Sequence, residues 1–104
     1  MKYMITFDER PQGSALEYER AQKRILDVFQ HWEQPANLTI EMYVIRVGDW
    51  GGYLLVDCDD PLVIHKLCSL LPALEFQVRP VMLAEDAIRA EREVIAWRDS
   101  LNLE

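Results

Sequence analysis

Apolar and polar residues alternate along residues 2–7, and this two-residue period is typical of a β-strand. The same alternation returns at 74–81, where Phe76 and Val78 fall on one side of the chain. Pro80 cannot donate a hydrogen bond to a neighbouring strand, so we expect this later strand to lie at an edge of its sheet or to end there.

The stretch 40–61 is dense in β-branched, aromatic and large aliphatic residues, in two runs that flank Gly48, Gly51 and Gly52. Glycine accepts the positive φ that a tight reversal needs, so we expect a β-hairpin that turns between Gly48 and Gly52. Neither run alternates cleanly between apolar and polar residues, which indicates that both faces of the hairpin are covered.

Apolar residues recur at spacings of three and four in the segment that follows the first strand, which predicts an amphipathic helix. Ser14 and Glu17 have the spacing of a capping box, in which the serine accepts a hydrogen bond from the Glu17 amide and the glutamate reaches back. The helix should begin there, and Pro35 should end it.

Asp60 and Pro61 predict the start of a second helix that runs to about Leu71, because proline lacks the amide hydrogen that would be unpaired there. A third helix is expected from Glu85 onward, and its apolar stripe must pack against something. That stripe consists of Ala87, Ala90, Val94, Trp97 and Leu101.

The predicted order is strand, helix, strand, strand, helix, strand and an added helix, which is the order of an α+β ferredoxin-like βαββαβ fold with an antiparallel sheet. We expect one domain over residues 1–104, with a core at 1–83 and a C-terminal helical extension at 84–104. The residues predicted under the helices are Ile5, Phe7, Met42, Val44, Leu54, Val56, Phe76 and Val78. The opposite face would carry Met4, Thr6, Glu41, Tyr43, Ile45, Tyr53, Leu55, Asp57, Glu75, Gln77 and Arg79.

That second face, which we call the open face, is too apolar to be left fully in water. We therefore expect a second subunit or the third helix to cover it.

The charge of the chain argues against two classes of partner. Its formal net charge is −7 at pH 7, the wrong sign for a surface that binds nucleic acid or anionic lipid. Neither a signal peptide nor a membrane-spanning run occurs in the sequence, so we expect a cytoplasmic protein. Cys58 and Cys68 do not form a disulfide framework and are expected to be thiols.

Two motifs, Gly51–Pro61 and Leu74–Val81, resemble a family of short, mostly bacterial proteins catalogued as a domain of unknown function. Its members look like the dimeric α+β barrel superfamily, so the resemblance, over most of the first 85 residues, implies a homodimer in which two sheets pack face to face. The superfamily includes monooxygenases, isomerases, haem-handling proteins and ligand sensors, so the fold alone does not specify a reaction. An aromatic residue frequent in the second helix of the family is replaced here within the run Leu67–Leu71.

The candidate ligand-binding residues are Tyr43, Tyr53, Asp57 and Arg79, which the predicted alternation places together on the open face near Thr6 and Gln77. Polar groups that converge in an apolar cleft are the usual composition of a small-ligand site. The alternative, which we favour, is that they form hydrogen bonds and a salt bridge at a dimer interface.

Other candidates are weaker. His65 and Cys68 share one side of the second helix, a spacing that could bring an imidazole near a thiol, but we favour the explanation that Cys68 is a small core residue and His65 a surface or edge residue. Trp50 in the hairpin loop could anchor a partner or fold back over the sheet edge. No metal-binding motif occurs, and we expect neither a metal nor a cofactor.

The sequence contains no recognisable set of acid, base and nucleophile. The sequence favours a non-enzymatic module that binds a small organic ligand or a protein partner. The expected protein partner is a second copy of the same chain. The alternative is a small cofactor-independent enzyme of the monooxygenase or isomerase type, in which Tyr43, Asp57 or His65 would handle protons and Arg79 would hold an anionic group.

Overall fold

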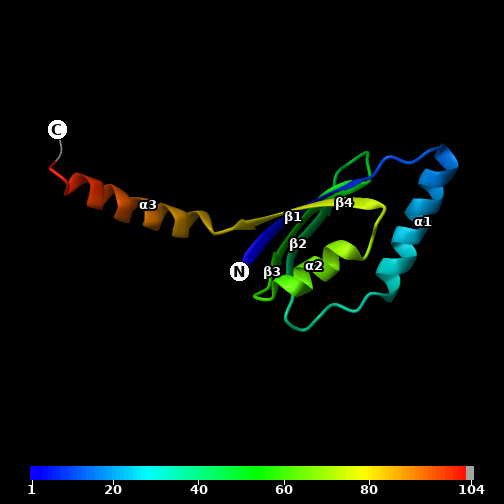
Figure 1. Ribbon diagram of the computed structural model, residues 1–104, viewed down its shortest axis with the longest axis horizontal. Coiled ribbons are helices and arrows are strands. Elements are labelled where there is room, and N and C mark those ends of the chain that lie inside the picture. Colours follow the sequence, from blue (N-terminus) through cyan, green and yellow to red (C-terminus); the bar gives the residue numbers. More distant parts are fainter. Residues whose placement is uncertain (103–104) are drawn as a thin grey trace.

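A computed structural model describes residues 1–102 of the chain and shows the predicted order of elements (Figure 1). These are β1 (Lys2–Glu9), α1 (Ala15–His31), β2 (Thr39–Ile45), β3 (Gly51–Asp57), α2 (Pro61–Ser69), β4 (Leu74–Val81) and α3 (Ala84–Asp99).

The four strands form one antiparallel sheet in the order β2-β3-β1-β4. This is the α+β ferredoxin-like arrangement predicted from the sequence. The expectation for Pro80 is confirmed as well, because β4 is an edge strand.

The helix starts follow the local sequence. At α1 the Ser14 hydroxyl accepts a hydrogen bond from the Glu17 amide at 3.2 Å, and the Glu17 carboxylate accepts one from the Gly13 amide at 2.8 Å. At α2 the Asp60 carboxylate accepts a hydrogen bond from the Leu62 amide at 2.9 Å. Ser14 and Asp60 thus each pair a first-turn amide that would otherwise lack a partner, whereas Glu17 reaches back to the residue before the cap.

The glycines of the hairpin have two different roles. Gly48 has a φ of 95° and supplies the reversal, as predicted. Gly51 and Gly52 lie within β3 and do not have a positive φ, so their predicted role in the turn is wrong. They are needed for close approach instead, because a Cβ at Gly52 would lie 2.0 Å from the Val44 carbonyl oxygen.

The apolar core is divided into two clusters between the helices and the sheet. One consists of Ile5, Leu38, Leu54, Val56, Cys58, Ile64 and Leu67. The other consists of Phe7, Ile25, Leu71 and Leu74. Phe76 and Leu70 contact both clusters, so the core is joined at these two side chains.

A register shift in β2 overturns part of the predicted face assignment. Ile40 pairs with Val56 and Met42 pairs with Leu55, so Glu41 is an additional residue in the strand. Because side chains alternate with a period of two, one additional residue turns every later side chain to the other face.

After this bulge, Tyr43 pairs with Leu54, and both lie on the helix-covered side of the sheet. Ile45 is on the same side, since it pairs with Gly52 opposite Phe7. Met42 and Val44 were predicted under the helices and lie instead on the open face.

Helix α3 projects away from the rest of the molecule, as a continuation of β4 (Figure 1). None of its residues is buried, so α3 does not cover the open face of its own chain, which was one of the two expected covers. The radius of gyration is 19.2 Å, whereas a compact domain of this length has about 13 Å.

We predict that Gly52→Ala lowers the free energy of unfolding by about 2–4 kcal/mol, because β2 and β3 would have to separate to admit the new methyl group. The measurement is urea denaturation followed by circular dichroism. Gly48→Asn is the control and should cost about 1 kcal/mol, since asparagine tolerates positive φ. Equal losses in the two variants would show that the close approach at Gly52 is not required.

Candidate functional site

Three of the four predicted ligand-binding residues lie on the open face, but they do not converge. In the sheet, Tyr53 of β3 lies opposite Thr6 of β1, and Asp57 lies opposite Lys2. Arg79 of β4 lies opposite Met4, on the other side of β1. Tyr53 and Asp57 are four residues apart on one strand, a separation of about 13 Å. The face therefore presents these polar groups singly among apolar residues.

Asp57 takes part in an ion-pair cluster at one end of the open face. Its carboxylate accepts hydrogen bonds from the Met1 amino group at 3.1 Å and from Lys2 Nζ at 3.3 Å. Lys2 also pairs with Glu41, the residue of the bulge. The hydrogen bonds from Met1 and Lys2 lower the pKa of Asp57. The hydrogen bond from Lys2 to Glu41 is the main cause of the raised pKa of Lys2.

Within residues 1–102, Arg79 makes neither an ion pair nor a side-chain hydrogen bond. Asp57 therefore pairs with Lys2 and not with Arg79 in the single chain.

The opposite end of the open face holds a second charged cluster. Arg46 Nε donates to the Asp49 carboxylate at 3.1 Å, and its guanidinium also pairs with Asp8. The same guanidinium lies 5.8 Å from the centre of the Tyr53 ring. Tyr53 is therefore held by a cation–π contact. Trp50, in the adjacent loop, is half-buried.

Tyr43, the fourth candidate, lies on the opposite side of the sheet from the other three. Its ring centre is 6.0 Å from that of Phe7 and 6.4 Å from that of Phe29. Burial raises the pKa of the Tyr43 phenol, which stays protonated at neutral pH. The placement of Tyr43 on the open face was wrong because of the bulge in β2.

Tyr43 lines a cavity of about 160 Å³ on the helix-covered side of the sheet. The other lining residues are Phe7, Phe29, Trp32, Ile40, Leu54, Leu67, Leu74 and Phe76. They come from both core clusters, so the cavity lies where the two halves of the core meet. Tyr43 is the only titratable residue among them.

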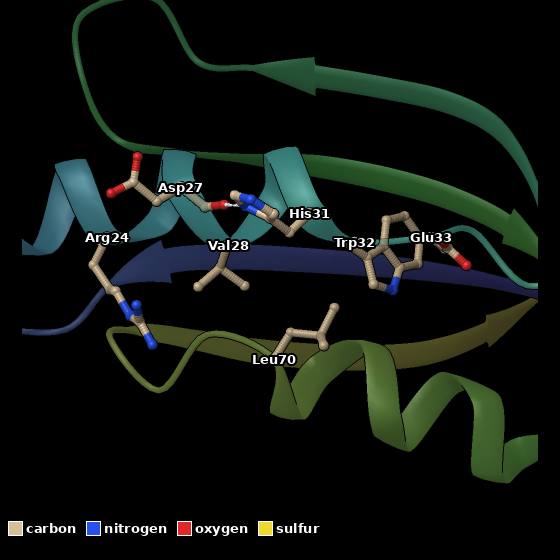
Figure 2. A pocket seen from close by; sticks show the side chains of 7 residues that line it. All are labelled: Arg24, Asp27, Val28, His31, Trp32, Glu33 and Leu70. Carbon is tan, nitrogen blue, oxygen red and sulfur yellow. Dashed lines mark hydrogen bonds between the residues drawn. The ribbon is translucent and has the colours of Figure 1, made fainter.

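An open groove of about 760 Å³ runs between α1 and the C-terminal end of α2 (Figure 2). Val28 and Leu70 point toward one another across it, and Arg24 lies at one end. At the other end is Trp32, which also lines the cavity, so groove and cavity adjoin at this side chain.

The remaining lining residues of the groove are Asp27, His31 and Glu33. His31 Nδ1 lies 2.8 Å from the Asp27 carbonyl oxygen, a hydrogen bond within α1 (Figure 2). The rim of the groove therefore carries both positive and negative side chains, and it does not favour a ligand of either charge.

The cavity is not fully enclosed, because Tyr43, one of its lining residues, is 50% exposed. Its lining is almost entirely apolar, so an apolar occupant would remove this surface from contact with water.

Other parts of the described chain show little chemistry. Burial raises the pKa of the Cys68 thiol, which keeps it protonated and weakens it as a nucleophile. Residues 1–102 contain no group of three His, Cys, Asp or Glu side chains able to hold a metal ion. No helix in the same range is long and apolar enough to cross a membrane.

The cavity was not predicted from the sequence. Its aromatic residues come from β1, α1, the residue that follows α1, β2 and β4, and each has an ordinary core explanation by itself. The one sequence signal is the imperfect alternation of Ile40–Ile45, which allowed a bulge without identifying its position.

The family described as a domain of unknown function (DUF3303) matches residues 1–95, and the chain belongs to this family. The match extends into α3, beyond the 85 residues covered by the resemblance. A search of curated proteins found no match.

We predict that Asp57→Asn reduces the loss of stability on acidification. The lowered pKa means that the ionised carboxylate stabilises the fold above the unfolded value, near 3.8, and that this contribution disappears as pH falls below it. The melting temperatures of the two proteins should differ above about pH 5 and converge at lower pH.

The control for this pH experiment is Glu75→Gln on the same face, because Glu75 makes no ion pair within residues 1–102. An equal pH dependence in Asp57→Asn and the unmodified protein would contradict the role of the Lys2–Asp57 pair.

Proposed function

We propose that this DUF3303 protein is a non-enzymatic module that binds a small, largely apolar molecule in the cavity between its helices and its sheet. The observation that carries the proposal is the aromatic-lined cavity of about 160 Å³ at the junction of the two core clusters. Ligand sites are concave, mostly apolar and provided with few polar groups, and this lining has that composition.

The size of the cavity supports a ligand built on one aromatic ring. An engineered cavity of about 150 Å³ in another protein, lined by Leu, Ile and Phe, binds benzene. Five aromatic side chains line the cavity here: Phe7, Phe29, Trp32, Tyr43 and Phe76. They offer edges and faces for an aromatic ligand, and the neutral Tyr43 phenol offers one hydrogen-bonding group.

The groove between α1 and α2 supports a route of entry. Trp32 lies at the boundary between groove and cavity, immediately after the end of α1. A rotation of this indole would connect the two spaces without moving the sheet.

The enzyme alternative has less support from the positions of its candidate residues. Tyr43 is separated from Asp57 and Arg79 by the sheet, and His65 is exposed on α2, so no pair of these groups shares a site within one protomer. The alternative predicts turnover of a small aromatic substrate that Asp57→Asn or Arg79→Gln abolishes without loss of fold. Binding without turnover is the outcome that our proposal requires.

We predict that Leu67→Phe abolishes binding of benzene and indole, because the larger ring fills the cavity from α2. Binding is measured by chemical-shift changes of the backbone amides of cavity residues during titration. The unmodified protein should show saturable shifts concentrated at Phe7, Tyr43 and Leu67, and a raised melting temperature.

The matched control is Leu62→Phe, the same change on the exposed side of the same helix. It should bind both probes like the unmodified protein. Absence of saturable binding in the unmodified protein, or equal binding by Leu67→Phe, would overturn the proposal.

A further inference from the structure

Helix α3 is amphipathic and uncovered. Its 16 residues include none that is buried by the rest of the described chain. Ile88, Val94, Ile95 and Trp97 are between 43% and 61% exposed. An isolated helix of this length is only marginally stable in water, because most helical stability in proteins comes from packing an apolar face.

The connection to β4 directs α3 away from its own sheet. Only Met82 and Leu83 separate the two elements, and Leu83 is extended, with φ −63° and ψ 141°. The chain therefore continues past the end of the sheet instead of turning back over it (Figure 1). Helix α3 therefore extends from the end of β4 away from the sheet.

The open face of the sheet is uncovered as well, and it matches α3 in length. Its apolar side chains are Met4, Met42, Val44, Tyr53, Leu55 and Val81. A helix of 16 residues is about 24 Å long, and strands of seven or eight residues span about 25 Å.

The two surfaces also complement one another in charge. Glu91 lies within the apolar arc of α3, between the directions of Ile88 and Val94. Arg79 projects from the open face and has no ion-pair partner within residues 1–102. Arg98, seven residues after Glu91, points in nearly the same direction but lies in the last turn of α3. Glu91, near the middle of α3, is the carboxylate that can pair with Arg79 when the two surfaces meet.

We propose that two copies of this chain exchange their C-terminal helices, so that each α3 lies along the open face of the partner and its Glu91 pairs with Arg79 of the partner subunit. The exchange is two-fold symmetric, so the contact between α3 and an open face forms twice. Neither an α3 nor an open face is left uncovered in the dimer. Each helix covers a strip about 24 Å long and 10 Å wide, so the two contacts together bury on the order of 1,000 Å², which is about the smallest area of a specific interface.

The first test compares two adjacent substitutions in the full chain. Ile95→Glu places a charge in the apolar arc of α3, and Ala96→Glu places the same charge on its polar side. Sedimentation equilibrium should show a dimer for the unmodified protein and for Ala96→Glu. Ile95→Glu should raise the dissociation constant at least tenfold.

The second test distinguishes exchange from other dimers. Arg79→Glu and Glu91→Arg should each raise the dissociation constant about tenfold, because like charges then face each other in both contacts. Mixing the two singly substituted proteins should restore a heterodimer. In that heterodimer one contact has the natural pair and the other has both charges reversed.

Three results would overturn the exchange. The unmodified protein could be a monomer at 100 μM, the two α3 substitutions could have equal effects, or mixing could fail to restore the dimer. A dimer of sheets packed directly face to face would respond to Arg79→Glu but not to Glu91→Arg. A helix folded back on its own sheet would give no restoration on mixing.

Discussion

The additional residue at Glu41 determines which side chains of β2 face the helices and which face outward. A strand has no freedom to correct a one-residue shift, because its side chains alternate strictly. The bulge turns Tyr43 toward Phe7 and Phe29 and so completes the aromatic wall of the cavity. It also turns Met42 and Val44 outward, which makes the open face more apolar. Both candidate binding surfaces depend on this one irregularity.

The two surfaces have different physical origins. The cavity exists because the core is divided, with side chains of two clusters meeting around a space that they do not fill. The open face exists because this fold places both central helices on one side of the sheet, and α3 is directed away from the other. A small apolar ligand suits the first surface, and a long amphipathic helix suits the second.

The charged residues of the open face lie mainly at its two ends. Lys2, Asp57 and Glu41 pair at one end, and Arg46 pairs with Asp8 and Asp49 at the other. These exposed pairs contribute little to stability. Between the two charged ends lies an apolar strip that is interrupted by Arg79. Because of this arginine, the face favours a partner surface with a matching negative charge over other apolar surfaces.

The sequence by itself determined the order of elements, because its signals are local: alternation at residues 2–7, the capping residues Ser14 and Asp60, and the proline in the edge strand. It also determined that three of the four candidate polar residues share the open face. Only the tertiary structure decided the position of Tyr43, since a bulge depends on how β2 pairs with β3 and not on β2 alone. The cavity and the uncovered α3 were likewise decided in three dimensions, because volume between packed side chains and the direction of a helix after a two-residue linker leave no periodic pattern in the chain.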